Sequence, residues 1–320
     1  MLLPQDQPDV KYRVHIRNCT VSSVLSPSES AEPVFDTSCV LPELVEEMWD
    51  WDVASPHRAE ALSFRCTPSR GLNLLVHYRT PMHTTWQFGS LSRQGQRHNF
   101  ATMLQNGVVI SAPQGPLGMI VVRLRPEAAT RLVGDRLRYF LNAGIGLDDL
   151  FGATRVSVLG EKLAEAATSA ERFSHMRAFL LSNRRSRHAE SAVSRAAALL
   201  RRDPRLRVRQ LAARLAVSER HLSRDFSAMF GMGPKQFARL ARIERVIAAR
   251  AQGAAWADIA YATGFTDQAH MINDFTAIVG VSPTELARPP STNTGLSGRA
   301  GASISPGATA FGMRQPHFIA

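Results

Sequence analysis

The sequence predicts an α+β protein: a β-rich, barrel-like N-terminal domain with helices after it, then an all-α domain. Two observations predict this fold class. Between residues 61 and 125, six short stretches with strand-like patterns are separated by turn residues. Beyond residue 189, apolar residues recur every three or four positions, which is the period of a helix. A length of 320 residues suits two domains.

The first 60 residues give the weakest signals. Residues 12–16 alternate and are expected to form a strand, whereas the Ser- and Pro-rich residues 22–33 are expected to be a loop. Residues 41–51 are expected to form a short amphipathic helix. We interpret Trp49 and Trp51 as core or rim packing rather than as a ligand platform.

The β-rich stretch contains clear turn signals, and Asn106-Gly107 between alternating runs is a strong hairpin signal. Short strands at regular spacing predict a small barrel or sandwich. A helical pattern begins after Pro126. The expected strands are 61–66, 72–78, 84–88, 98–103, 108–111 and 119–124, and the expected helices are 127–133, 135–141, 147–151, 157–167 and 170–182.

One pattern occurs twice within residues 208–283. Its first half recurs at an offset of 48 residues and its second half at an offset of 49, so the second copy has one extra residue in its turn. Such a repeat indicates two copies of one supersecondary unit. The residues expected to form the motif core are Leu211, Ala212, Leu222 and Phe226 in the first copy, and Ile259, Ala260, Gly264, Phe265, Met271, Phe275, Gly280 and Pro283 in the second.

Each copy has the pattern of a helix-turn-helix. Ser218 is expected to cap the second helix of the first copy, and Gly264 is expected to supply the turn of the second copy with a positive φ. In such a motif the second helix enters the major groove of DNA. Residues 234–252 predict a connecting helix about 27 Å long, which can place two second helices in groove segments about 34 Å apart.

These patterns divide the chain into four parts. Residues 183–209 contain nine arginines and two acidic residues, and the first of them form the junction before the repeat. The last part of the chain is rich in Gly, Ser, Pro and Thr. The parts are an N-terminal domain of residues 1–182 (β-rich over 61–125, helical over 127–182), a basic junction of residues 183–188, a DNA-binding domain of residues 189–288, and a tail of residues 289–320 that is predicted to be disordered.

The double motif resembles the DNA-binding domain of AraC/XylS-type bacterial transcription regulators. The residues that carry the resemblance include Gly-Phe-Thr-Asp at 264–267 and Gly-Val-Ser-Pro at 280–283, and it covers about residues 189–288. It implies a cytoplasmic, sequence-specific regulator that activates or represses a bacterial promoter. It also implies a cupin-like N-terminal domain that binds a small-molecule effector, pairing into a homodimer, and contact with RNA polymerase.

DNA contacts are expected on the exposed face of each second helix and around the motifs. Arginine bonds a guanine edge in bidentate fashion, whereas Gln and Asn suit adenine. Relatives often carry a basic residue at the position of Asn273, so the second motif is expected to bind more weakly. The expected base-reading residues are Arg220, His221, Ser223, Arg224, Gln268, His270 and Asn273, and the expected phosphate contacts are Arg209, Arg214, Ser218, Lys235, Arg239 and Thr266.

The composition agrees with a polyanionic partner, since the net charge is +11 and the isoelectric point is about 10.6. Three cysteines, Cys19, Cys39 and Cys66, are widely spaced and are interpreted as reduced thiols of a cytoplasmic protein. The first residues do not have the pattern of a signal peptide, and no apolar run is long enough to span a membrane.

An enzyme is the main alternative. His77, His83 and His98 lie in the β-rich region, where a cupin-like barrel could gather them around a metal ion, but their spacing does not match a metal motif. We expect no catalytic residue, metal or cofactor. The alternatives are a metal- or ligand-dependent cupin-like enzyme fused to a DNA-binding domain, and a non-specific architectural DNA binder.

Overall fold

A computed structural model describes most of the chain between residues 12 and 287. The described residues are 12–16, 18–26, 28–29, 31–38, 41–88, 91–96, 99–134, 137–185 and 191–287. The predicted tail of residues 289–320 and part of the predicted basic junction lie outside them.

The described residues of the N-terminal part form two six-stranded sheets in which all strand pairs are antiparallel. The first has the order β1-β2-β5-β10-β7-β8 and the second the order β12-β9-β6-β11-β4-β3. The strands are β1 Tyr12–Ile16, β2 Cys19–Ser23, β3 Val34–Phe35, β4 Val45–Val53, β5 Leu62–Cys66, β6 Leu72–His77, β7 His83–Phe88, β8 Leu91–Gln96, β9 Asn99–Thr102, β10 Val108–Ala112, β11 Leu117–Leu124 and β12 Ile145–Gly146.

Strand β11 shows how the layers pack, because every residue in it is buried. Met119 and Val121 belong to an apolar cluster that also contains Phe64 of the first sheet, so this face of β11 lies between the two sheets. Ile120 and Val122 belong to a second cluster, which includes the helices beyond the second sheet. A strand that is covered on both faces explains the nearly continuous apolar run of its sequence.

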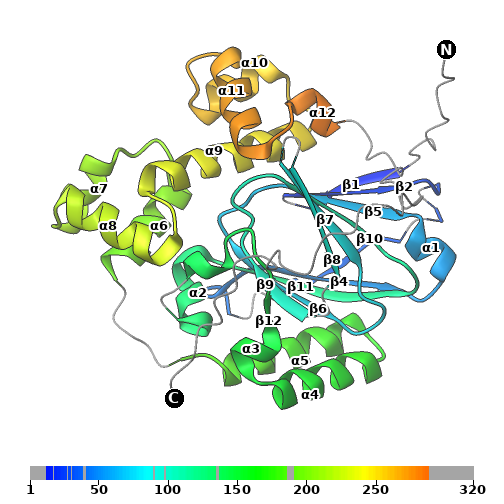
Figure 1. Ribbon diagram of the computed structural model, residues 1–320. Helices are drawn as coiled ribbons and strands as arrows, with labels where there is room; N and C mark the ends of the chain where they lie inside the picture. Colours follow the sequence, from blue (N-terminus) through cyan, green and yellow to red (C-terminus); the bar gives the residue numbers. More distant parts are fainter. Residues whose placement is uncertain are drawn as a thin grey trace, which may run out of the picture. The chain divides into compact units, whose positions relative to one another are not determined.

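Helices cover the outer face of the second sheet (Figure 1). Helix α5 begins with a capping box, in which Thr168 and Glu171 each bond the other's backbone N–H. Inside the same helix, Phe173 and Met176 are buried in the shared core. The helices and the 3-10 turn of this region are α1 Pro56–Glu60, α2 Pro126–Val133, η1 Leu137–Phe140, α3 Leu147–Phe151, α4 Ala153–Glu165 and α5 Ser169–Ser182.

A buried ionic network fastens α5 to the second sheet. The carboxylate of Asp50 in β4 accepts hydrogen bonds from Arg172 (3.1 Å), Ser169 (2.8 Å) and the Tyr78 hydroxyl (2.6 Å). The Asp50 side chain is fully buried. Burial, together with the hydrogen bond to this carboxylate, raises the pKa of Tyr78, so the hydroxyl stays a donor. Arg172 also pairs with Asp52 at 2.8 Å.

One prediction for this region is wrong. Residues 41–51 do not form a helix, because Val45–Val53 is strand β4 and pairs with β11 and β3. Trp49 and Trp51 do pack in a core, on the face between the sheets. Of the two expected arrangements, a small barrel or a sandwich, the described strands form the second, as two separate sheets that pack against each other. The predicted α+β class, with β-rich and helical parts in this order, is confirmed.

Two of the three cysteines face each other across neighbouring strands. Cys19 of β2 lies directly opposite Cys66 of β5, and both thiols are free. The adjacent pair is hydrogen-bonded from Thr67 N–H to Asn18 C=O at 2.7 Å. Because hydrogen-bonded and non-hydrogen-bonded pairs alternate, the cysteines form a non-hydrogen-bonded pair with α-carbons about 4.5 Å apart. Cys39 lies outside the described residues.

The C-terminal part is entirely helical in its described residues. One long helix, α9, has α6, α7 and α8 near one end and α10, α11 and α12 near the other (Figure 1). Pro234 starts α9, where its fixed φ and missing N–H are tolerated. The helices are α6 Ala192–Arg202, α7 Val208–Leu215, α8 Glu219–Phe230, α9 Pro234–Ala251, α10 Trp256–Thr263, α11 Gln268–Val279 and α12 Pro283–Ala287.

Candidate DNA-binding site

The first helix-turn-helix consists of α7 and α8. Ala216 makes the turn in the left-handed conformation, with φ of 54°. Ser218 then caps α8, and its hydroxyl accepts the backbone N–H of His221 at 3.2 Å. Gly231 ends α8 with φ of 68°. The N-terminus of α8 is thus fixed by local bonds, as a helix that inserts into a groove requires.

The second helix-turn-helix repeats this construction in α10 and α11. Gly264 makes the turn with φ of 82°, as the sequence predicts. Asp267 caps α11, and its Oδ1 accepts the backbone N–H of His270 at 2.8 Å. Gly280 ends α11, again with φ of 82°. The two copies therefore have the same three features: a turn residue with positive φ, a side-chain N-cap on the second helix, and a glycine that ends this helix.

The predicted motif cores are buried. Each first helix packs a small residue, Ala212 or Ala260, against its partner, which allows the close crossing of the two helices. In the first motif, Phe226 and Phe230 pack with Phe237 of α9, with ring centroids 4.7 to 5.4 Å apart. The other predicted core residues that are buried are Leu211, Leu222, Ile259, Phe265, Met271, Phe275 and Pro283, and the half-buried ones are the turn and stop glycines Gly264 and Gly280.

The expected base-reading residues lie on the outer faces of α8 and α11. Ser223 is half-buried, and the rest of the set is exposed. Within α8, Asp225 bonds two of these residues: Oδ1 accepts from Arg224 Nε and Oδ2 pairs with His221 Nε2, both at 2.9 Å. The exposed residues are Arg220, His221, Arg224, Gln268, His270 and Asn273.

The expected phosphate contacts divide into two groups. Arg239 is already engaged inside the protein, because its Nη2 and Nε donate to the carboxylate of Asp274 at 2.7 and 3.2 Å. Arg242 lies 3.6 Å from the same carboxylate and over the ring of Phe265. Burial lowers the pKa of Arg242. The second group is exposed and comprises Arg209, Arg214, Ser218, Lys235 and Thr266.

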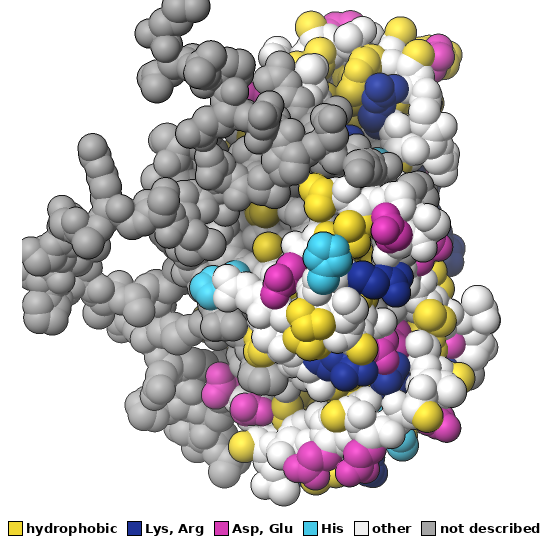
Figure 2. Space-filling view, turned by 90° about the vertical axis from the view of Figure 1, so that its right-hand side faces the viewer, with side chains coloured by type: hydrophobic (Ala, Val, Ile, Leu, Met, Phe, Trp, Pro, Cys, Tyr) yellow, Lys and Arg dark blue, Asp and Glu magenta, His cyan; other side chains and the backbone are white. Residues whose placement is uncertain are grey.

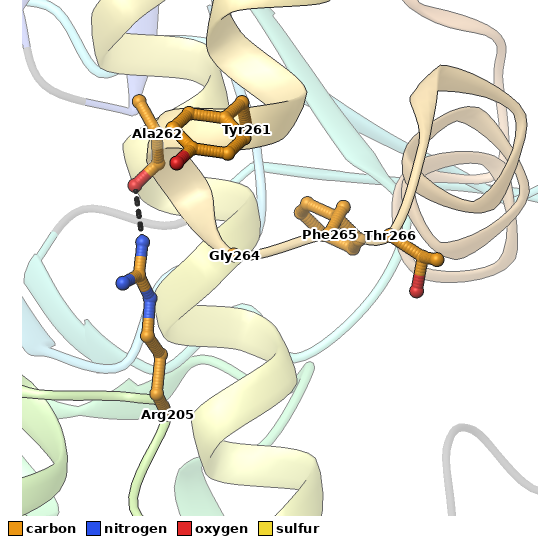
Figure 3. Close-up of a pocket in the computed structure, with 6 residues that line it drawn as sticks. All are labelled: Arg205, Tyr261, Ala262, Gly264, Phe265 and Thr266. Atoms are coloured by element: carbon orange, nitrogen blue, oxygen red, sulfur yellow. Dashed lines mark hydrogen bonds between the residues drawn. The ribbon is translucent and has the colours of Figure 1, made fainter.

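Sequence reasoning missed Arg205, which connects the two motifs. From the loop before α7, its Nη2 donates to the C=O of Ala262 in α10 at 2.9 Å (Figure 3). Beside this bond lies an open hollow of about 430 Å³, next to the turn at Gly264. Tyr261 at its edge is 86% exposed. Arg205 belongs to the arginine-rich run, but no local pattern distinguishes it from its neighbours.

Comparison with known proteins identifies this domain. Residues 211–289 match a family described as a helix-turn-helix domain. The match spans both motifs and α9, and the residues inside it include the Gly-Phe-Thr-Asp and Gly-Val-Ser-Pro segments of the AraC-type pattern. Residues 211–289 belong to this family of helix-turn-helix domains.

Several solved structures are similar to this chain at low identity. ToxT from Vibrio cholerae is 11% identical, with 80% of this chain and 97% of that chain covered and a TM-score of 0.42. The C-terminal domain of AraT, a response regulator from Geobacillus stearothermophilus, is 24% identical over 34% of this chain and 94% of that chain, with a TM-score of 0.30. The AraC-like transcriptional activator CuxR is 12% identical over 74% and 92%, with a TM-score of 0.21. No curated protein matches the chain in sequence.

The N-terminal part of the chain contacts the helix-turn-helix domain directly. Arg70, before β6, forms an ion pair with Glu244 of α9, and its guanidinium also lies over Phe237. Arg201 of α6 pairs with Glu127 of α2 at 2.8 Å. Near the second motif, two backbone carbonyls accept bonds from the sheets: that of Ile278 from Gly107 N–H (3.1 Å) and that of Leu286 from Arg65 (3.0 Å). Both motifs are thus connected to the same N-terminal part.

Among the described residues, the histidines considered for a metal site do not form a cluster. His77 is buried in β6 and His83 is exposed in β7, while His98 lies outside the described residues. Within the described ranges, no three His, Cys, Asp or Glu side chains are placed to hold a metal ion. None of the helices in these ranges is long and apolar enough to cross a bilayer. Where described residues are visible in Figure 2, acidic and basic side chains are interspersed.

Proposed function

We propose that the protein recognises two adjacent major-groove segments of a bacterial promoter with the N-terminal ends of α8 and α11. The observation that carries this proposal is the duplication itself: two capped second helices stand at either end of α9, which has 18 residues. A helix of that length is about 27 Å long. This is close to the distance of about 34 Å between successive major-groove segments on one side of the duplex.

The two motifs have different chemistry for base recognition. In α8, Arg220 and Arg224 are suited to guanine because arginine donates two parallel hydrogen bonds to its O6 and N7. In α11, Gln268 and Asn273 are suited to adenine. Asp274 follows directly and adds a negative charge to α11, which contains no Lys or Arg. We therefore assign the stronger specific contacts to the first motif and the weaker ones to the second.

The N-terminal part is proposed to control how the motifs are presented. It contacts α9, α6, α11 and α12. A conformational change in the sheets would therefore alter the contacts that position both motifs. A small-molecule effector and pairing into a homodimer are the proposed signals. RNA polymerase is the proposed partner of the DNA-bound form, in the cytoplasm, with activation or repression set by the position of the site.

Selection of bound DNA from a random pool, with the full-length protein at a stated salt concentration, tests this function. Two half-sites one helical turn apart are expected, with guanine enriched in the half-site of the first motif. Salt titration should give a steep loss of affinity, because phosphate contacts release counterions. Recovery of no sequence preference under any condition would contradict the proposal.

A further inference from the structure

The repeat places an aspartate at the same position in both second helices, but the two carboxylates have different partners. Asp274 in α11 binds Arg239 and Arg242 of α9, and so fastens its helix to the connecting helix. Asp225 in α8 instead binds His221 and Arg224, which are both expected to read bases. One position of the repeat is therefore structural in the second motif and faces the recognition surface in the first.

The bonds around Asp225 form a closed ring. Arg224 Nη2 lies 2.9 Å from His221 Nδ1, which completes the circuit from Asp225 through both side chains. An imidazole with its single proton on Nε2 satisfies every bond, since it donates to Asp225 and accepts from Arg224. The ring uses the Nε–H and one of the two N–H groups of Nη2. The other N–H of Nη2 lies on the opposite edge, beside Nη1. The edge formed by Nη1 and Nη2 is left for a bidentate pair with the O6 and N7 atoms of guanine.

The exposure of this ring indicates what it does. The side chains of Arg224, His221 and Asp225 are 69%, 53% and 36% exposed. Ion pairs on such a surface add little to folding stability, because solvent screens them. An arginine that is held in one orientation before binding, however, loses less side-chain entropy when it meets its base. The ring should therefore act on recognition rather than on folding.

We propose that Asp225 is a positioning residue that orients Arg224 for guanine and so sets the specificity of the first motif. The proposal rests on the assignment of α8 as a recognition helix. It has a distinctive consequence, because the carboxylate also repels the phosphate backbone. Asp225 lowers affinity for every DNA sequence while it increases discrimination at one base. Its removal should therefore change specificity and general affinity in opposite directions, whereas a merely structural role would lower both.

The test compares full-length wild type with Asp225→Ala, Asp225→Asn, Arg224→Ala and the double variant Asp225→Ala/Arg224→Ala. Dissociation constants are measured for the selected site, for the same site with the guanine opposite Arg224 replaced, and for a random duplex. Wild type should discriminate about 10- to 100-fold at that guanine. Asp225→Ala should lose most of this factor and bind the random duplex more tightly. Asp225→Asn should keep part of it, because the amide oxygen still accepts from Nε.

The double variant and a matched control decide the interpretation. Once Arg224 is absent, removing Asp225 should cause no further loss of discrimination. Asp274→Ala, at the equivalent position of the second motif, should lower the thermal midpoint and leave discrimination at this guanine unchanged. Full discrimination in Asp225→Ala, or an equal loss with and without Arg224, would overturn the proposal while the protein remains a specific binder. A wild type without any sequence preference would instead refute the proposed function itself.

Discussion

Arg70 and Glu244 form an ion pair between the N-terminal part and the connecting helix α9, with both side chains 13% exposed. The carboxylate of Glu244 also accepts the backbone N–H of Arg70 at 2.6 Å. The pair joins residues 174 positions apart in the chain. Because the guanidinium lies over Phe237 as well, a single arginine connects the sheets to the aromatic cluster beneath the first motif.

Glu244→Gln should destabilise the protein by about 2–4 kcal/mol, because it leaves the Arg70 guanidinium largely buried without its counter-charge. Chemical denaturation followed by circular dichroism measures this. The matched control is Glu43→Gln, which breaks the pair between Glu43 and Arg184. Those side chains are 39% and 32% exposed, so a cost below about 1 kcal/mol is expected. Equal costs for both variants would contradict the role of burial.

Arg224→Ala should cost about 1–3 kcal/mol of binding free energy at its own base and relax the preference there. Lys235 is the matched control, because it is an exposed cation expected to contact a phosphate. Lys235→Ala should weaken binding to all sequences about equally. It should also reduce the slope of log affinity against log salt concentration by about one, because one fewer counterion is released. Competition binding against a set of single-base variants distinguishes these outcomes. An unchanged preference at every base in Arg224→Ala would refute its assignment.

Substitutions in the turns of the two motifs should change stability in opposite directions. Ala216 has φ of 54°, a region that costs an alanine about 1 kcal/mol relative to glycine. Ala216→Gly should therefore stabilise the first motif by up to about 1 kcal/mol. Gly264 has φ of 82°, and a Cβ there would lie 2.7 Å from Arg205 Nε. Gly264→Ala should destabilise by about 1–2 kcal/mol. Thermal unfolding in which both substitutions change stability in the same direction would contradict this account.

The facing thiols predict a specific disulfide under mild oxidation. Hydrogen peroxide should take one proton and one electron from each of Cys19 and Cys66, forming the S–S bond and two waters. The hydrogen bond with Cys66 and burial raise the pKa of the Cys19 thiol, and the thiolate is the nucleophile, so oxidation should be faster at higher pH. Peptide mass mapping should find these two cysteines linked. Cross-links through Cys39 in equal amount would contradict the pairing, and Cys19→Ser serves as the control.

The sequence was most informative where local patterns are dense. Caps, turns and apolar periods lie within a few residues of each other in the double motif, so its helices and core could be predicted. The helix predicted for residues 41–51 is wrong because the strand pattern of β4 is short: only Trp49, Trp51 and Val53 alternate with acidic residues. Trp49 and Trp51 pack between the sheets, whereas Met48 and Asp50 face the helices. Contacts such as that of Arg70 with Glu244 depend on how distant segments dock, and no local pattern encodes them.

The single helix that joins the motifs also restricts how the protein can change over generations. Each residue of a helix turns the chain by about 100° and advances it by about 1.5 Å. Inserting or deleting one residue in α9 would therefore swing the second motif to another side of the duplex. Only changes of nearly whole turns keep both motifs on one side. The spacing of the half-sites should accordingly be inherited almost unchanged, while the base-reading residues of each motif remain free to diverge.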